Sequence, residues 1–457
     1  MSQIFDVAVV GAGVVGAAIA RELKRYDLDV AVLEARADVG DGTSKANTAL
    51  LHTGFDSAPG TLESQLVRRG YELLSAYAVV TGIPVERTGA LLVAWNGDEL
   101  AALPELQDKA RRNGYHRCQI VDAAEVYRRV PHLGAGVVGG LTVPDESVIC
   151  TWTTSLALAT EAKLRGAQIL LNHRVDGVVV GEAVTTIRTD AVEVRAQWVV
   201  NAAGLGCDLV DRMYGYDRFS VVPRRGELLV FDKQARSLVD TIVLPVSSKR
   251  GKGVLISPTI YGNVMLGPTA EPLLDRGDTA TSEAGFEYLL DKGATLMPTL
   301  LDEEVTASYA GLRAAIDRDD YLIAADADQR YILVGGIRST GLTSSMAIAE
   351  YVCGLLAAAG LALTNRAELP EPPRMPNLGE AFRRPYQDAE RIAADPEYGR
   401  IVCFCERVTA GEVRDALSSR LPPADLAGLR RRTRATNGRC QGFYCGADVD
   451  AMLRGSR

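Results

Sequence analysis

The glycine pattern near the start of the chain restricts the fold more than any other feature. An apolar run rich in β-branched residues, 5–10, leads directly into Gly11-x-Gly13-x-x-Gly16, and an alanine-rich stretch, 17–23, follows. This order predicts a strand, a tight turn and a helix. Gly11 permits the turn, Gly13 lets a pyrophosphate approach the backbone, and Gly16 lets the helix pack closely against the strand. The positive end of that helix would stabilise the pyrophosphate.

A second predicted strand, residues 29–33, ends at Glu34, which lies 23 residues after Gly11. At this spacing a carboxylate can accept hydrogen bonds from the ribose of an adenosine. The alternative, a chance glycine turn, does not account for the strand, the helix and the acidic residue together. We therefore expect a dinucleotide-binding βαβ unit at the start of the chain.

Small-residue segments farther along favour FAD as the dinucleotide. The polar loop 42–47 can pass close to a pyrophosphate and an extended flavin, and predicted strands at 197–200 and 331–336 each end in small residues. The second of these strands leads into a helix, 344–356, whose N-terminus would stabilise negative charge on a reduced flavin. One FAD site assembled from both ends of the chain explains these turns. Its further expected residues are Thr43, Ser44, Asn47, Gly204, Gly336, Gly341 and Leu342.

Four of the eight cysteines crowd the last 55 residues, at Cys403, Cys405, Cys440 and Cys445. Four thiolates closing on one point hold either a structural zinc or an iron–sulfur cluster. Zinc sites commonly use pairs spaced C-x2-4-C, so the C-x-C pair and the flavin site upstream favour a [2Fe-2S] cluster over zinc or an empty site. The other cysteines lack partner spacing and are expected to be buried, inert thiols. They are Cys118, Cys150, Cys207 and Cys353.

The length and charge of the chain exclude several classes of protein. With 457 residues, it is too long for one ordinary core, so two or three domains are expected. The net charge of −8 argues against a general nucleic-acid binder. The first residues lack the features of a secretory signal, and no apolar run reaches the roughly 20 residues that cross a bilayer. We expect a soluble, cytoplasmic protein with reduced thiols, and membrane attachment through a partner is left open.

The tail differs in charge from the rest of the chain. From residue 401 onward there are ten Arg and six Asp or Glu, which gives about +4 against about −12 for residues 1–400. A basic surround would offset the negative charge of a four-thiolate cluster, and the alternative is an ordinary solvated face. The arginines concerned are Arg430, Arg431, Arg432, Arg434 and Arg439.

Longer segments resemble known flavoenzymes. Residues 43–62, 223–228, 253–259, 267–271 and 309–313 are similar to segments of the FAD-dependent D-amino-acid-oxidase-like superfamily. Within it, the first segment is close to a loop shared by glycerol-3-phosphate dehydrogenases of the anaerobic type and L-2-hydroxyglutarate dehydrogenases. The tail, with Cys403-Phe-Cys405 and residues 431–445, resembles the bacterioferritin-associated-ferredoxin-like [2Fe-2S] module of the anaerobic enzyme's catalytic subunit. The hydroxyglutarate enzymes generally lack that module, so the tail is the most discriminating part.

The resemblance implies an α/β fold in which residues 1–360 form an FAD-dependent oxidoreductase domain. This domain would combine a Rossmann-type FAD lobe with an antiparallel-sheet substrate lobe that roofs the flavin. The expected bounds are about 1–78, 150–215 and 325–360 for the FAD lobe, and about 79–149 and 216–324 for the substrate lobe. The resemblance also adds Val175 to the cofactor site.

Six prolines between 361 and 400 predict an extended linker draped over the catalytic part. Residues 401–457 would then form a small helical [2Fe-2S] module. Thr409-x-x-Glu412 is a candidate capping box for its first helix, because the threonine can accept from the backbone and the glutamate can reach back. A second helix is expected from beyond Cys445 to about Leu453.

Oxidising an anionic alcohol at a flavin requires a base for the hydroxyl proton and fixed positive charge for the anion. His52, in a glycine-bounded loop of the FAD lobe, is the candidate base, and the alternatives are that it orients the substrate or is purely structural. Arg suits the anion because its planar fork matches carboxylate and phosphate. Arg313 and Arg338 lie where relatives hold substrate. Arg225 and Lys252 are weaker candidates, since charged residues at sheet edges are usually solvated.

These features together predict an FAD-dependent dehydrogenase of the glycerol-3-phosphate dehydrogenase type, which oxidises a small phosphorylated or carboxylated alcohol to the ketone. Electrons would leave the FAD through the [2Fe-2S] cluster to a redox-partner subunit or carrier, rather than pass directly to oxygen. The alternatives are an L-2-hydroxyacid dehydrogenase, an amine or imino-acid oxidoreductase, and a non-catalytic electron-transfer subunit.

Overall fold

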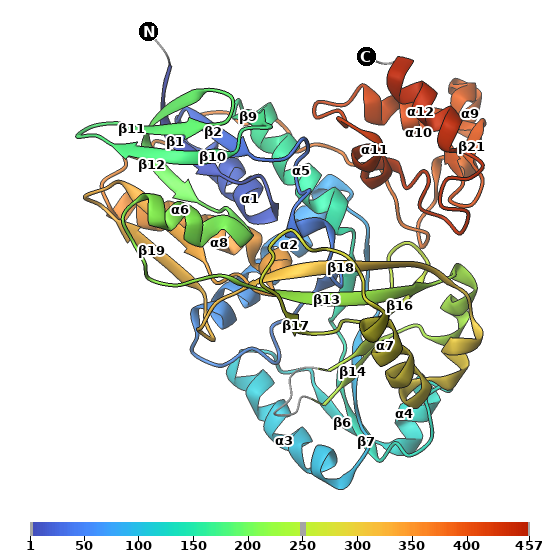
Figure 1. The fold of residues 1–457 in the computed structure, drawn as a ribbon. Helices are drawn as coiled ribbons and strands as arrows, with labels where there is room; N and C mark the ends of the chain where they lie inside the picture. The colour runs from blue at the N-terminus through green and yellow to red at the C-terminus, as the bar shows by residue number, and fades with distance from the viewer. Residues whose placement is uncertain (1–2, 247–252, 456–457) are drawn as a thin grey trace.

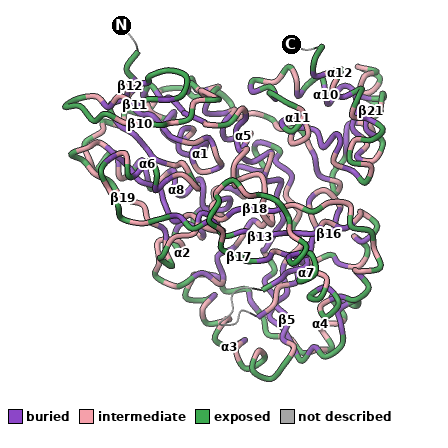
Figure 2. Tube along the Cα trace, viewed as in Figure 1, coloured by how far each residue is buried: buried purple, intermediate pink, exposed green. Residues whose placement is uncertain are grey.

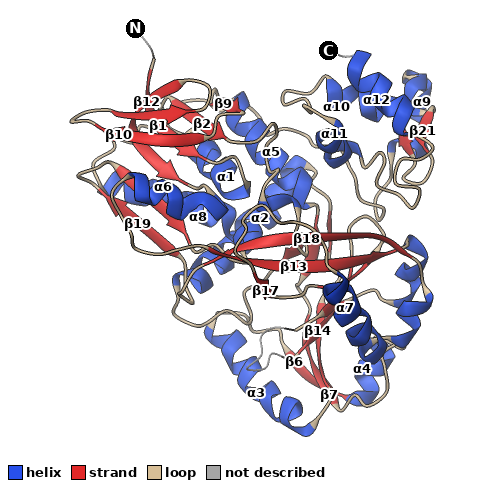
Figure 3. Ribbon diagram, in the orientation of Figure 1, coloured by secondary structure: helices blue, strands red, loops and turns tan. Residues whose placement is uncertain are grey.

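The computed structural model describes residues 3–246 and 253–455, which form two joined lobes and a small C-terminal domain (Figure 1). An eight-stranded sheet organises the first lobe (Figure 3). Its five central strands are mutually parallel, as in a doubly wound nucleotide-binding sheet. In sheet order these are β20 (Tyr331–Gly335), β12 (Glu193–Asn201), β1 (Ile4–Val10), β2 (Val30–Glu34) and β9 (Gln168–Leu171). The antiparallel additions are β10 (Val175–Val180), β11 (Thr185–Thr189) and β19 (Leu322–Asp326).

Helices from distant parts of the chain cover this sheet. They are α1 (Val14–Leu23), α2 (Leu62–Thr81), α5 (Thr151–Leu164), α6 (Cys207–Met213) and α8 (Gly341–Ala358). Helix α8 packs on α1 and α2 and lies in the buried centre of the lobe (Figure 2). Among the described residues, α8 is the one helix long and apolar enough to cross a membrane, but 61% of that stretch is buried inside the protein. Burial in the core accounts for its apolar composition.

A nine-stranded sheet organises the second lobe and crosses the mouth of the first (Figure 1). Its long strands β13 (Val222–Phe231) and β18 (Val305–Ala315) pair along their full length. The other strands are β5 (Ala90–Ala94), β6 (Gln119–Asp122), β7 (Gly139–Val143), β14 (Ile242–Pro245), β15 (Leu255–Pro258), β16 (Val264–Gly267) and β17 (Glu271–Pro272). The expectation of an antiparallel sheet is correct except at one pair, since β5 and β14 run parallel. Helices α4 (Ala123–Arg129) and α7 (Glu283–Leu296) pack on one face of this sheet, and α3 (Gly97–Arg112) packs on the other.

A small three-stranded sheet joins the lobes at the His52 loop. It consists of β3 (Leu50–Leu51), β8 (Ser147–Ile149) and β4 (Val85–Glu86). The pairing of β3 with β8 brings the loop after residue 51 next to the turn before residue 147. Two segments nearly 100 residues apart in sequence thereby face the same space.

The segment 361–400 runs across the catalytic part before it reaches the C-terminal domain. Tyr26 forms a bridge with Asn365, and the backbone N–H of Met375 donates to the carbonyl of Thr81 at 2.7 Å. The segment also contains a short helix, α9 (Ala389–Ala394), that the proline pattern does not predict.

The C-terminal domain contains a two-stranded sheet and three helices. These are β21 (Ile401–Cys403), β22 (Val408–Thr409), α10 (Ala410–Leu417), α11 (Leu426–Thr433) and α12 (Gly446–Gly455). The predicted capping box is confirmed at the start of α10, since Glu412 N donates to Thr409 Oγ1 at 3.2 Å and Thr409 N donates to Glu412 Oε2 at 2.9 Å. The expected last helix corresponds to α12, whereas α11 is an addition to the expected pair of helices.

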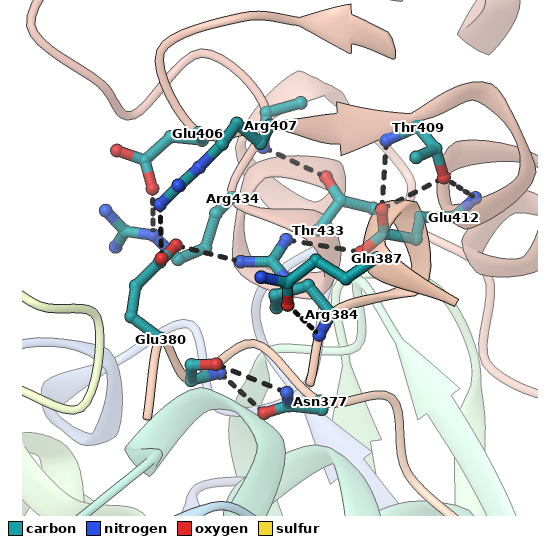
Figure 4. Close-up of polar contacts among 12 residues, drawn as sticks. Asn377, Glu380, Arg384, Gln387, Glu406, Arg407, Thr409, Glu412, Thr433 and Arg434 are labelled. Atoms are coloured by element: carbon teal, nitrogen blue, oxygen red, sulfur yellow. Dashed lines mark hydrogen bonds and ion pairs between the residues drawn. The ribbon is translucent and has the colours of Figure 1, made fainter. Parts of the chain in front are cut away.

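Arg384 ties the preceding segment to this domain (Figure 4). Its side chain is 1% exposed and pairs with Glu380 and Glu412, both at 3.2 Å. Glu380 also pairs with Arg407, and with Lys233 of the substrate lobe at 3.0 Å. Because breaking a buried ion pair leaves an uncompensated charge, these contacts hold linker, domain and lobe together.

Candidate functional site

A large cavity of about 1590 Å³ lies between the two lobes. The carboxyl ends of the parallel strands line one side of it, and β13 and β18 line the other. In open α/β sheets, ligands bind at this edge of the sheet. The cavity therefore lies where a nucleotide cofactor and a substrate would meet.

The glycine turn at the cavity is built so that only glycine fits. Gly11 has a φ of +101°, and a Cβ added to it would lie 2.6 Å from the carbonyl oxygen of Ala202. A Cβ on Gly16 would collide with the carbonyl of Gly11, so Gly16 serves the packing of α1 on β1 and does not line the cavity. Gly13 begins α1 without any side-chain cap, and its backbone faces the cavity. This cradle fits a pyrophosphate.

Glu34 anchors the turn as well as facing the cavity. Its Oε2 accepts from Ala12 N at 2.7 Å and its Oε1 accepts from Arg36 N at 2.9 Å. Burial raises the pKa of Glu34 despite these two amide donors. Each oxygen retains a lone pair, so an additional donor such as a ribose hydroxyl can still bind.

The other segments predicted for the cofactor meet at the same cavity. Ser44 Oγ accepts from Val14 N at 2.9 Å, which joins the loop 42–47 to the start of α1. At the opposite end, α8 begins at Gly341 without a side-chain cap and opens into the cavity. The predicted cofactor residues that line the cavity are Gly11, Gly13, Glu34, Thr43, Ser44, Asn47, Val175, Gly204, Gly336, Gly341 and Leu342.

Two arginines face each other on the roof of the cavity. Arg224 of β13 and Arg313 of β18 are cross-strand partners, and both line the cavity. Like charges directly opposite each other on a sheet are destabilising, so this pair requires an anion or water between its members. Sequence reasoning missed Arg224, although strand alternation places it on the face opposite Arg225.

The charge of Arg313 is poorly compensated by the protein. Within the described chain its side chain donates to the carbonyl of Thr269 at 3.4 Å, and no described carboxylate pairs with it. Burial, reinforced by the neighbouring Arg224, lowers the pKa of Arg313 to about 10, so it remains charged at neutral pH. A desolvated guanidinium of this kind would bind a phosphate or carboxylate strongly.

The other predicted substrate arginines are already paired. Arg338 lines the cavity but bonds to Asp319 at 3.0 Å and Glu63 at 3.3 Å. Arg225 is buried against Glu271 at 2.6 Å and Asp278 at 3.3 Å, so it is a structural residue and not a solvated one. Lys252 lies outside the described residues.

His52 lies in the cavity wall between two carboxylates. Its Nδ1 is 2.8 Å from Glu146 Oε1 and its Nε2 is 2.9 Å from Asp56 Oδ1. Burial alone would lower the pKa of His52, but Glu146 and Asp56 outweigh it and raise the pKa to about 10. His52 is therefore an imidazolium that donates from both nitrogens at neutral pH. Sequence reasoning missed both carboxylates because Glu146 comes from a distant turn and Asp56 had no distinguishing signal.

We expect His52→Gln to destabilise the fold most at low pH. The folded-state pKa of about 10 exceeds the ordinary value of 6.5, so the stabilisation from charged His52 is fully present below pH 6.5 and is lost as pH rises to 10. The measurement is the difference in unfolding free energy between wild type and variant at several pH values across this range. A difference that grows with pH would contradict the charged pair.

The four predicted cluster ligands lie in the C-terminal domain as two pairs of neighbouring thiols. Cys405 pairs with Cys440, and Cys403 pairs with Cys445. Across residues 3–246 and 253–455, no set of three or more His, Cys, Asp or Glu side chains closes on a single metal ion. Two thiol pairs suit a two-iron centre, in which each iron takes two thiolates, better than one tetrahedral zinc.

The loop after Cys440 favours negative charge at this sulfur. The backbone N–H groups of Tyr444, Gly442 and Phe443 point at the Cys440 sulfur and lower its pKa, as an anionic cluster requires. Cys405 and Cys440 are partly exposed, whereas Cys403 and Cys445 are buried. The centre therefore approaches the surface on one side.

Three of the five tail arginines pair with carboxylates of the catalytic part. Arg431 and Arg432 both pair with Asp38 of the FAD lobe, at 2.8 and 2.7 Å. Arg439 pairs with Asp232 of the substrate lobe at 3.0 Å. These three arginines attach the domain to the catalytic part, and Arg439, which is 48% exposed, also lies close enough to Cys405 for their charges to interact.

A doubly wound nucleotide sheet, a roofed cavity and a four-thiolate domain define the class: an oxidoreductase that carries its own electron-transfer centre. Residues 6–355 match the family described as FAD dependent oxidoreductase, and residues 401–454 match the BFD-like [2Fe-2S] binding domain. The chain therefore belongs to the FAD-dependent oxidoreductase family and ends in a [2Fe-2S] domain. Its cofactors are FAD and a [2Fe-2S] cluster, as predicted.

Individual relatives match most of the chain. A glycerol 3-phosphate dehydrogenase of Caloramator mitchellensis is 33% identical over 452 residues, which cover 98% of this chain and 94% of that protein. One subunit of the anaerobic glycerol-3-phosphate dehydrogenase of Escherichia coli is 27% identical, with 99% and 88% covered. The FAD-bound L-alpha-glycerophosphate oxidase of Mycoplasma pneumoniae superposes with a TM-score of 0.77 and 26% identity, and covers 82% of this chain and 99% of its own.

Proposed function

We propose that this protein oxidises glycerol 3-phosphate to dihydroxyacetone phosphate. The observation that carries the proposal is the pair Arg224 and Arg313, whose uncompensated positive charge faces the cavity that the glycine-rich turns also line. The names of the relatives that cover this chain agree with a phosphorylated substrate. FAD, when bound, accepts the hydride that leaves the alcohol carbon of the substrate.

Residues around the cavity would bind the phosphate, exclude water and handle the hydroxyl proton of the substrate. Arg313, with Arg224, would bind the phosphate, and the roof formed by β13 and β18 would exclude water. Because Glu146 and Asp56 engage both ring nitrogens of His52, we propose that Asp56, which also lines the cavity, accepts the hydroxyl proton of the substrate, and that His52 holds this carboxylate in place rather than acting as the base. Glu146 fixes the orientation of the ring through Nδ1, so that Nε2 faces Asp56 and the cavity. Arg338 would stabilise the loop that bears it, because it is neutralised by Glu63 and Asp319.

We further propose that electrons leave through the [2Fe-2S] cluster to a separate redox protein. The two relatives described as dehydrogenases span 98% and 99% of this chain, whereas the oxidase spans 82%. One of the dehydrogenases is a subunit by name, which supports a multi-subunit assembly. Phe404, Phe443 and Tyr444, next to the cysteines, are 73%, 84% and 75% exposed, which suits a surface that a partner covers. All eight cysteines are free thiols, which agrees with a reducing, cytoplasmic compartment.

An anaerobic spectral titration tests the substrate. Glycerol 3-phosphate should bleach the flavin absorbance of the purified holoprotein, while L-2-hydroxyglutarate, free glycerol and amino acids at the same concentration should not. Bleaching by the hydroxy acid at lower concentrations than by the phosphate would transfer the assignment to a 2-hydroxyacid dehydrogenase. If no hydroxy compound bleaches the flavin, the proposal fails.

A further inference from the structure

A continuous set of side-chain contacts begins at the cofactor cavity. Trp152, near the start of α5, donates its indole N–H to the carbonyl of Lys45 at 2.9 Å. Lys45 ends the short turn Thr43–Lys45, whose first two residues line the cavity. The ring of Trp152 stacks on that of Tyr261 with a centroid separation of 5.1 Å and an interplanar angle of 27°. Tyr261 is held from its other end, where its hydroxyl lies 3.2 Å from Cys150 Sγ.

The same contacts continue into the cluster domain. The guanidinium carbon of Arg434 lies 4.1 Å from the centroid of the Tyr261 ring and 5.9 Å from that of Trp152. Arg434 Nε donates to Glu406 Oε2 at 2.8 Å, as Figure 4 shows. Glu406 directly follows Cys405, one of the cluster thiols. The contacts thus run from the cavity through Trp152 and Tyr261 to Arg434, and from Arg434 to the loop that carries Cys405.

The backbone of Arg434 indicates that its side chain is needed there. Arg434 ends helix α11 with a φ of +71°, in the left-handed region where glycine or asparagine is the favoured residue. Its side chain is 7% exposed, and Glu406 is 3% exposed. A strained position that retains a long, buried, charged side chain is held by the contacts of that side chain.

We propose that Arg434 is the positioning residue that fixes the cluster domain on the catalytic part, against Tyr261 of the substrate lobe and Trp152 of the FAD lobe, so that these two rings bridge the cofactor cavity and the Cys405 loop for electron transfer. Each transfer removes one electron from the reduced flavin and adds it to the oxidised cluster. No bond between heavy atoms is made or broken, and the flavin's proton passes to solvent. The inference rests on the proposed function only in taking FAD as the donor to the cluster.

If Arg434 only stabilised its own domain, its replacement would change neither the docking of that domain nor the rate of cluster reduction. The contact of Arg432 and Arg431 with Asp38 is a separate anchor, so the domain stays attached when Arg434 is replaced. The variants can therefore report on alignment rather than on loss of the domain. Arg454→Gln is a matched control, because Arg454 belongs to the same domain, is 77% exposed and pairs only locally with Asp450.

The first test measures docking in the holoprotein without any turnover. Limited proteolysis should cleave the segment 361–400 at least about tenfold faster in Arg434→Gln than in wild type, because the substitution leaves Glu406 buried with one partner fewer. Tyr261→Phe, which keeps the ring that Arg434 contacts, and Arg454→Gln should be cleaved at the wild-type rate. Wild-type cleavage of Arg434→Gln would overturn the positioning role.

The second test measures electron transfer after flash photoreduction of the FAD, so that it does not depend on the identity of the substrate. Cluster reduction, followed at its own visible bands, should slow several-fold in Tyr261→Leu and in Arg434→Gln. Tyr261→Phe keeps the ring and should retain the wild-type rate. Wild-type cluster reduction in Tyr261→Leu, or equal slowing in Tyr261→Phe, would overturn the aromatic bridge. Both the proteolysis test and the cluster-reduction test remain valid if glycerol 3-phosphate fails to bleach the flavin, because neither test uses a substrate.

Discussion

Arg313→Met should lose substrate-dependent flavin reduction while it keeps its FAD and its fold. Removing one partner of a desolvated charged contact costs about 2–5 kcal/mol, so the apparent affinity for glycerol 3-phosphate should fall by about 30-fold to several thousand-fold. The fold should not suffer, because in the described chain Arg313 has no carboxylate partner and lies opposite Arg224. Removing one of two facing like charges relieves repulsion, so the melting temperature should stay the same or rise.

The matched control for this variant is Arg338→Met. Arg338 lines the same cavity and has the same charge, but Glu63 and Asp319 neutralise it. Its loss should affect the affinity for substrate by about tenfold or less, since its side chain is engaged by Glu63 and Asp319 and does not bind the phosphate. The measurement is the concentration dependence of flavin bleaching under anaerobic conditions. Equal losses in both variants would show that phosphate binding does not depend on the Arg224 and Arg313 pair.

Cys440→Ser should separate the two halves of the reaction. Serine is a poorer iron ligand than thiolate, so the variant should lose iron and acid-labile sulfide. FAD content and bleaching by substrate should persist, because Asp38, Asp232 and Glu380 continue to attach the domain to the catalytic part. Loss of a partner that only supports a metal ligand typically lowers metal affinity or activity by about 10- to 100-fold. Loss of the ligand itself should slow reoxidation by a one-electron acceptor protein by at least this factor.

Cys118→Ser is the control for this second variant. Cys118 is a buried thiol of the catalytic part whose pKa is raised to about 12 by burial, as expected for an inert cysteine. The Cys118→Ser protein should retain the full complement of iron and sulfide. If Cys440→Ser lost flavin reduction and reoxidation to the same extent, the cluster would be a structural element of the enzyme and not its electron exit.

The parts of the fold that local sequence determines could be predicted. Gly11 is required by the positive φ of its turn and Gly16 by its contact with the carbonyl of Gly11, and the capping box at Thr409 and Glu412 depends on residues three apart. The four thiols could be grouped because their residue type and spacing restrict the chemistry. In each case the interaction that fixes the structure is short in sequence or unusual in composition.

The parts that escaped prediction depend on register between distant segments. Arg224 becomes a candidate only when β13 is paired with β18 in the observed register, which places it opposite Arg313. The charge state of His52 depends on Glu146, which arrives through the pairing of β3 with β8. The composition of the tail shows that its arginines form a basic group. It does not show that Asp38 and Asp232 form ion pairs with them.

The assembly of the nucleotide sheet from three separate stretches has a consequence for biosynthesis. Strand β1 leaves the ribosome first, but its neighbour β12 is made much later, and β20 and α8, residues 331–358, are made last. Until that final stretch has emerged, a nascent chain presents a glycine turn with an incomplete cradle and an uncovered apolar sheet face. Cofactor loading must therefore follow synthesis of nearly the whole catalytic part, and until then the uncovered apolar surface favours aggregation.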